Sequence, residues 1–187
     1  MLIRHADPSA DAAGCLAVYA PFADETAISF EDRAPTLSEF QQRIERIGRT
    51  HAFLVAEDDG EIAGFAYAGT HRDRPAYRWS AEASVYLGER YRGRGLGRAL
   101  YEPLFALLAE QGYRVILAGI AVPNDASVGL HRALGFKDVG TYRRIGWKAG
   151  AWRDVIWLAL QLGPDTEETE PPPSPGPPAR LARPIDF

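Results

Sequence analysis

The turn Arg92-Gly93-Arg94-Gly95-Leu96-Gly97, followed by Arg98, has the residue types that point most directly to chemistry. A strand-like run precedes it and an apolar helix begins near Gly95, so the first N–H groups of that helix lack internal partners. The helix dipole makes this end positive, and glycines let an anion approach the backbone closely. We therefore predict that the turn binds phosphate groups, with Arg92, Arg94 and Arg98 adding positive charge. The alternative is a glycine-rich connection that only turns the chain.

Two other phosphate-binding motifs do not fit this turn. A Walker loop carries Lys followed by Ser or Thr after its last glycine, whereas this sequence has Arg98-Ala99. A dinucleotide-binding fold has its glycine motif after the first strand, whereas this motif comes after several strands. The prediction is therefore phosphate binding outside both of these folds.

Glu82 is the candidate residue for acid–base chemistry. It stands in a strand-like run with Trp79, Val85 and Tyr86, where partial burial would raise the pKa of a carboxyl group and make it a better base. A half-exposed carboxylate in a structural ion pair is the alternative, and the residue pattern alone leaves both open.

The elements that must position these residues alternate between strands and helices. Thr36 and Glu39 form a capping-box pattern, and Asp58-Asp59-Gly60 is a hairpin-turn signal between neighbouring strands that we expect to be antiparallel. The pattern predicts a mixed α/β fold, with a central sheet of about six to seven strands and flanking helices. Strands are expected near residues 2–5, 51–57, 61–70, 77–87, 113–122, 136–147 and 152–162, and helices near residues 9–19, 37–47, 95–111 and 126–134.

Composition narrows the class of protein. The chain has 187 residues, of which 46% are hydrophobic, enough for one domain with a core. A net charge of −4 gives no reason to expect nucleic acid or an anionic membrane as partner. Cys15 is the single cysteine, and no Cys/His grouping has the spacing of a metal site. We therefore expect that the protein binds no metal. Because the sequence has no signal-peptide pattern and no membrane-spanning apolar run, we also expect it in the cytoplasm.

The composition changes after Gly163. Eight of the 14 prolines fall between Pro164 and Pro184, next to an acidic run at residues 165–170. Such a segment cannot form a core of its own. We expect a domain at residues 1–162 and a proline-rich, acidic tail at 163–187 that is extended or disordered. The alternative is a tail that lies across its own domain or a partner subunit.

At this point the residues resemble a known family. The glycine-rich turn fits the Arg/Gln-x-x-Gly-x-Gly/Ala pattern of the Gcn5-related N-acetyltransferases (GNAT). The run at residues 77–87, the Leu100-Tyr101 pair and the segments 123–127 and 131–136 look like the phosphinothricin and methionine sulfoximine acetyltransferase branch. The resemblance covers nearly all of residues 1–162, and the tail is similar to tails in some phosphinothricin acetyltransferases. It implies the GNAT fold, acetyl-CoA as cofactor, and direct acetyl transfer to an amine in a ternary complex.

The resemblance also implies roles near the cofactor. Acyl transfer to an amine needs a base, donors for the oxyanion and an acid for the leaving thiolate. Glu82 stands at the position of the base, and His131 at that of the acid, with Tyr101 as a weaker candidate for the acid. For His131 and for Tyr101, the alternative is a side chain that only packs in the core. The remaining cofactor contacts would come from the backbone N–H groups of a splayed strand, from a carboxamide, and from a hydroxyl that caps the next helix or touches the cofactor: Val85, Tyr86, Leu87, Asn124 and Ser127.

For the acceptor, membership of this branch implies a small amino acid or analogue with a free α-amine. Arg72 and Arg74 would point to the same side if their segment is extended, and they could then bind its anionic groups; a solvated basic loop is the alternative. Tyr77 and Phe30 would line the same pocket. Glu31 also belongs there, but it stands where some phosphinothricin enzymes have a basic residue, which argues against phosphinothricin itself.

Other functions stay open at the level of sequence. The enzyme could act on a protein N-terminus, which needs an open groove, or on a polyamine, which favours an acidic pocket, whereas the candidate loop is basic. The chain could instead be a catalytically silent acyl-CoA-binding regulator, although the retained Glu82 argues against this. The expected partner is a small amine, and a homodimer is an open alternative to a monomer.

Overall fold

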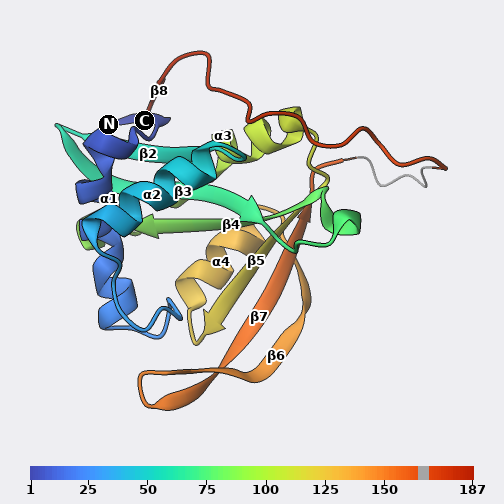
Figure 1. Ribbon diagram of the computed structural model, residues 1–187. Helices are drawn as coiled ribbons and strands as arrows, with labels where there is room; N and C mark the ends of the chain where they lie inside the picture. The colour runs from blue at the N-terminus through green and yellow to red at the C-terminus, as the bar shows by residue number, and fades with distance from the viewer. Residues whose placement is uncertain (164–168) are drawn as a thin grey trace.

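A mixed sheet crosses the molecule in the strand order β6-β7-β5-β4-β3-β2-β1-β8. The computed structural model describes residues 1–163 and 169–187, and Figure 1 shows the arrangement. The strands are β1 (Leu2–His5), β2 (Phe53–Asp58), β3 (Glu61–Thr70), β4 (Ser80–Leu87), β5 (Val115–Val122), β6 (Lys137–Lys148), β7 (Ala151–Gln161) and β8 (Ile185–Asp186). The helices are α1 (Pro8–Asp24), α2 (Leu37–Gly48), α3 (Leu96–Gln111) and α4 (Asp125–Ala133).

The mixed α/β class is confirmed, and two boundaries differ from the prediction by three residues or more. Strand β4 begins at Ser80 rather than at residue 77, because Pro75–Tyr77 form a 3₁₀ turn with proline at its start. Helix α1 continues to Asp24, past Pro21, because Tyr19 and Phe22 are buried on its inner face. Tertiary packing outweighs the helix-breaking tendency of the proline here.

The two faces of the sheet carry different helices. On one face, α1 and α2 bury Tyr19, Phe40 and Ile44 against Phe53 and other side chains of β2 and β3. On the other face, α3 buries a row of leucines and Tyr101, and side chains of α4 pack against the same core. The alternation of side chains along β2 and β4 supplies both cores, as expected for a sheet covered on both sides.

The sheet opens between β4 and β5, and this opening positions the site. These parallel strands pair only over Ser80↔Val115, Ala81↔Ile116 and Glu82↔Leu117. Beyond these pairs, β4 keeps β3 as its partner up to Leu87, and β5 keeps β7 up to Val122. The two strands therefore diverge while each stays in the sheet, as Figure 1 shows.

The described part of the tail follows the surface of the domain. The backbone of Gly176 exchanges hydrogen bonds with Gln111: its N–H donates to the Gln111 carbonyl (2.8 Å), and its own carbonyl accepts from the Gln111 side chain (2.9 Å). The Leu181 N–H donates to Nε2 of His5 (3.0 Å), and β8 pairs antiparallel with β1. This strand makes the sheet eight-stranded rather than six- or seven-stranded. Residues 164–168, which hold most of the predicted acidic run, lie outside the described residues.

A buried histidine makes the stability of the fold depend on pH. Burial lowers the pKa of His51 to about 4, and its Nε2 lies 2.7 Å from the Tyr113 hydroxyl. His51 is therefore protonated near pH 6.5 in the unfolded chain but only near pH 4 in the folded chain. Its contribution to the free energy of unfolding is present above pH 6.5 and is lost as the pH falls.

As the pH falls from 7 to 5, we expect protonation of His51 in the unfolded chain to lower the free energy of unfolding by about 2 kcal/mol. Urea denaturation at a series of pH values measures it, in a window above the range where most carboxylates titrate. In the variant His51→Gln, the decrease in the free energy of unfolding between pH 7 and pH 5 should be smaller by about that amount. An unchanged slope in the variant would remove His51 from this account.

Candidate active site

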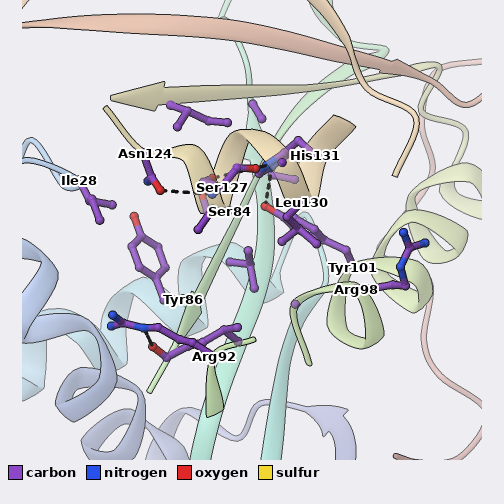
Figure 2. Close-up of a pocket in the computed structure, with 18 of the residues that line it drawn as sticks. Ile28, Ser84, Tyr86, Arg92, Arg98, Tyr101, Asn124, Ser127, Leu130 and His131 are labelled. Atoms are coloured by element: carbon purple, nitrogen blue, oxygen red, sulfur yellow. Dashed lines mark hydrogen bonds between the residues drawn. The ribbon is translucent and has the colours of Figure 1, made fainter. Parts of the chain in front are cut away.

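A cleft of about 540 Å³ fills the opening between β4 and β5. Its walls come from both diverging strands, the first turns of α3, and α4, and from Phe22 and Ile28 on the α1 side. Because Ser84 and Tyr86 lie on one face of β4 and Tyr101 and His131 come from the helices on the other face, the cleft passes through the sheet. Figure 2 shows these side chains converging on it.

The predicted phosphate turn forms one end of the cleft. Gly93 and Gly95 have positive φ angles of 72° and 85°, and α3 begins at the next residue, Leu96. Gly95 is the N-cap residue and offers no side chain to the free N–H groups of the helix, so they stay available to an anion. The glycines, Leu96 and Gly97 all line the cleft.

Two of the three predicted arginines lie at the cleft. Nε of Arg92 donates to the Leu87 carbonyl (3.2 Å), and its guanidinium lies 4.9 Å from the centre of the Phe22 ring. Arg98 donates to the carbonyl of Ala133 (2.9 Å) and thereby joins α3 to the end of α4. Arg94 is exposed and does not line the cleft. The positive charge at this end therefore comes from Arg92, Arg98 and the start of α3.

The edge of β4 supplies backbone groups to the cleft. Val85, Tyr86 and Leu87 all line it, and none of the three has a strand partner on the β5 side within the described sheet. The main-chain N–H groups that point towards β5 are therefore free to bond a ligand. The ring of Tyr86 is fixed by edge-on contacts with the rings of Tyr19 and Phe22, whose centres lie 4.9 Å and 5.2 Å away.

Asn124 and Ser127 line the opposite wall, at the start of α4. The side-chain oxygen of Asn124 accepts from the Ser127 N–H (3.2 Å), so Asn124 caps the helix. The alternative in which Ser127 is the cap is thereby wrong, because Ser127 lies within the first turn. The carboxamide NH₂ of Asn124 keeps its two hydrogens for a ligand.

His131 and Tyr101 form a buried pair beside the cleft. Nδ1 of His131 lies 2.8 Å from the Ser127 carbonyl, which only accepts, so Nδ1 carries the hydrogen. Nε2 then accepts from the Tyr101 hydroxyl at 3.1 Å, as Figure 2 shows. Burial lowers the pKa of His131 despite the opposing hydrogen bond to Ser127, and burial also raises the pKa of Tyr101. At neutral pH the shared proton therefore rests on Tyr101.

Glu82 lies where β4 and β5 separate, in the last pair before the opening. It does not line the cleft itself, but the next two residues, Ala83 and Ser84, do. Its side chain is 37% exposed, and Oε1 lies 2.7 Å from Nδ1 of His71. The carboxylate is thus partly open to solvent and held by a neighbouring histidine.

The five predicted acceptor residues lie outside the cleft lining. Arg72 and Arg74 are exposed in the loop that leads into the 3₁₀ turn at Pro75–Tyr77, rather than in a strand. Tyr77 contacts His71 edge-on at 5.8 Å and so approaches Glu82 indirectly.

The other two residues lie beside the β6–β7 hairpin. The ring of Phe30 is so close to Gly146 that any side chain at that glycine would collide with it. The carboxylate of Glu31 accepts from Arg43 at 2.5 Å, and its carbonyl accepts from Lys148. Glu31 therefore fixes the segment before α2 to the hairpin.

Several lining residues were missed by the sequence reasoning. Residues 118–121 of β5 line the cleft, and the small residues of this Ala-Gly-Ile-Ala run were the available signal. The others join the site through tertiary contacts: Phe22, Ile28, Ala83, Ser84, Ala126, Gly129, Leu130 and Ala133. His71 had also not been singled out.

Two kinds of site are not found in the described part of the chain. No group of three or more His, Cys, Asp or Glu side chains could hold a metal ion there. Among the same residues, no helix combines the length and apolar character needed to cross a bilayer.

Comparison with known proteins points to one family. Residues 3–157 match the family described as "Acetyltransferase (GNAT) domain". The phosphinothricin N-acetyltransferase of Streptomyces viridochromogenes is 38% identical over 79% of this chain and 80% of its own length. The L-methionine sulfoximine/L-methionine sulfone acetyltransferase of Pseudomonas aeruginosa is 36% identical over 83% of this chain and 91% of its own length.

Solved structures have the same architecture. The phosphinothricin acetyltransferase of Sinorhizobium meliloti in complex with AcCoA is 33% identical, with a TM-score of 0.83 over 90% of this chain and 92% of that one. The ribosomal-protein-alanine N-acetyltransferase of Brucella melitensis is 35% identical, with a TM-score of 0.81 over 86% of this chain and 99% of that one.

Proposed function

The chain belongs to the GNAT acetyltransferase family, and from this premise we propose that it transfers the acetyl group of acetyl-CoA to the α-amine of a small amino acid or amino-acid analogue. The observation that carries the proposal is the cleft through the sheet, with an anion-binding turn at one end and Glu82 beside the point where the strands part. The relatives are named for acetylation of phosphinothricin and of methionine sulfoximine or sulfone, and these names support an amino-acid analogue as the acceptor.

The residues present fit acetyl-CoA. Gly93 and Gly95, with their positive φ angles, leave the start of α3 open to a pyrophosphate, and Arg92 and Arg98 add positive charge. The free edge of β4 at residues 85–87 and the carboxamide of Asn124 would bond the amides of the pantetheine arm. When bound, this cofactor supplies an acetyl group activated as a thioester.

The side chains of this protein then divide the proton transfers. Glu82 accepts a proton from the ammonium of the acceptor, which leaves the amine as a nucleophile. Backbone N–H groups at the open edge of β4 stabilise the negative charge that develops on the carbonyl oxygen. The proton for the leaving sulfur comes from the His131–Tyr101 pair. Because the hydrogen rests on Tyr101, its hydroxyl is the donor in this proposal, and His131 orients it.

The acceptor's anionic groups are assigned to Arg72 and Arg74, because their loop follows His71, which contacts Glu82. Alanine at either position should raise the acceptor KM about ten- to a hundred-fold and leave the acetyl-CoA KM nearly unchanged, because one charge-assisted contact is lost. Steady-state kinetics with the best acceptor measures both constants. Arg78→Ala, in the same exposed region, is the control. An unchanged acceptor KM in both variants would make the loop a solvated surface.

Release of free CoA from acetyl-CoA, measured with a panel of acceptors, tests the proposed function itself. The panel contains amino acids, methionine sulfone and sulfoximine, phosphinothricin, a polyamine and a peptide with an N-terminal alanine. Acceptor-dependent release with the amino-acid analogues is the expected result. Release with the peptide alone would favour action on a protein N-terminus, in line with the Brucella neighbour's name. Cofactor binding without any release would indicate a silent acyl-CoA-binding regulator.

We also propose that the chain forms a homodimer through the β6–β7 hairpin. Five large apolar side chains of this hairpin are exposed, including Val139 (62%), Trp147 (61%) and Ile145 (55%). Such clustering on one element is typical of protein interfaces. A monomeric mass by light scattering at micromolar concentration would count against this.

A cytoplasmic location is proposed from the single cysteine, and secretion of the intact chain would contradict it.

A further inference from the structure

His71 immediately follows β3, and its ring turns towards β4. Its Nδ1 lies 2.7 Å from Oε1 of Glu82, and within the described residues this is the hydrogen bond recorded for the ring. The His71 side chain is only 12% exposed, against 37% for the Glu82 side chain. A largely buried imidazole thus holds one oxygen of a carboxylate that is itself partly open to solvent.

Two aromatic rings fix the orientation of His71. The rings of Tyr77 and Trp157 lie edge-on to it, each at 5.8 Å between ring centres. Trp157 is constrained in turn, because it stands opposite Gly119 on β5 and Gly140 on β6. A Cβ at Gly119 would come within 3.0–3.2 Å of the Trp157 ring, so this glycine leaves room for the indole. The histidine therefore reaches Glu82 from a rigid aromatic support.

The donor in this hydrogen bond follows from the chemistry of the two groups. An ionised carboxylate only accepts, so Nδ1 of His71 carries the hydrogen and Nε2 keeps the lone pair. With Oε1 engaged, Oε2 of Glu82 is left to meet an acceptor amine. A charge-assisted bond of this kind is stronger than one between neutral groups.

We infer that His71 is a positioning residue for Glu82, which holds the carboxylate in the rotamer that receives the acceptor's proton. This inference rests on the proposed function, because it assigns a support to the proposed base. Without His71, a half-exposed glutamate would sample several rotamers, and only part of its population would face the acceptor. The role predicts an effect on kcat rather than on cofactor binding.

Paired substitutions test this role. His71→Phe keeps a ring between Tyr77 and Trp157 but removes the donor, whereas His71→Asn retains an N–H donor near the position of Nδ1. We expect His71→Phe to lower kcat about ten-fold with the acetyl-CoA KM unchanged, and His71→Asn to recover most of the loss. In a Glu82→Gln background, His71→Phe should have little further effect, because the two residues act as a unit.

The contrary outcomes are equally specific. If His71→Phe keeps the wild-type kcat, or lowers it by the same factor in the Glu82→Gln background, the inference is overturned. The same holds if His71→Asn is as impaired as His71→Phe while both keep the wild-type Tm.

A readout without turnover separates this inference from the proposed function. Nitrogen-15 NMR of the imidazole identifies which ring nitrogen of neutral His71 carries the hydrogen. We expect Nδ1, and a hydrogen on Nε2 in the wild-type protein would overturn the pairing. If no acceptor is acetylated in the panel, the proposed function fails, whereas the NMR result still decides whether His71 holds Glu82.

Discussion

Glu82→Gln is expected to lower kcat by about 10²–10⁴ at neutral pH, while acetyl-CoA still stabilises the fold. The amide keeps the size of the side chain but cannot take the proton from the acceptor's ammonium. The deficit should shrink as the pH rises, because a larger fraction of the amine is then free without a base. Initial rates from pH 6 to pH 9.5 measure this with the acceptor that gives the most CoA release.

A second glutamate provides the matched control for this substitution. Glu61 lies on β3, is paired with Arg90 and is 63% exposed at its side chain, outside the cleft lining. Glu61→Gln should leave kcat within about two-fold of the wild type, because surface pairs of this kind contribute little. Wild-type turnover in Glu82→Gln would remove Glu82 from the mechanism, and an equal loss in Glu61→Gln would point to an indirect effect of lost charge.

Gly95→Val is expected to abolish the rise in Tm that acetyl-CoA produces in the wild-type protein. Among the described residues, only the ring of Phe187 comes within 4 Å of a Cβ placed at Gly95, at 3.8 Å, so the side chain has room when no ligand is bound. The same side chain would stand over the start of α3, where the pyrophosphate is proposed to sit. A wild-type protein saturated at 100 times Kd gains about 2.7 kcal/mol from binding, which a thermal-shift assay detects readily.

Strain at this position is separated from loss of binding by a second glycine. Gly60, in the turn between β2 and β3, has φ of 82°, close to the 85° of Gly95, and apart from its chain neighbours no atom of the described residues lies within 4 Å of its added Cβ. Gly60→Val should therefore lower Tm by a similar amount as Gly95→Val but keep the full shift with acetyl-CoA. If the Gly95 variant is folded and also keeps the shift, the assignment of the cofactor turn is wrong.

Local signals in the sequence determined much of the fold. Thr36 and Glu39 form the predicted capping box at the start of α2, and Gly112 ends α3 with a φ of 104°. Strands β1 and β3 have the predicted bounds. These features depend on contacts within a few residues, which is why residue types and spacing are sufficient to predict them. The glycine-rich turn is local in the same sense, and it lines the cleft as a continuous segment apart from Arg94.

The tertiary structure alone decided how the site is completed. The parting of β4 from β5 depends on each strand having another partner, and no pattern within either strand encodes that. His131 meets Tyr101 across 30 residues, and His71 meets Glu82 across 11, through the packing of whole elements. The tail likewise adds β8 to β1 across nearly the full length of the chain. Sequence patterns report which face of an element is apolar, whereas these pairs depend on which elements become neighbours, and that follows from burying all the faces together.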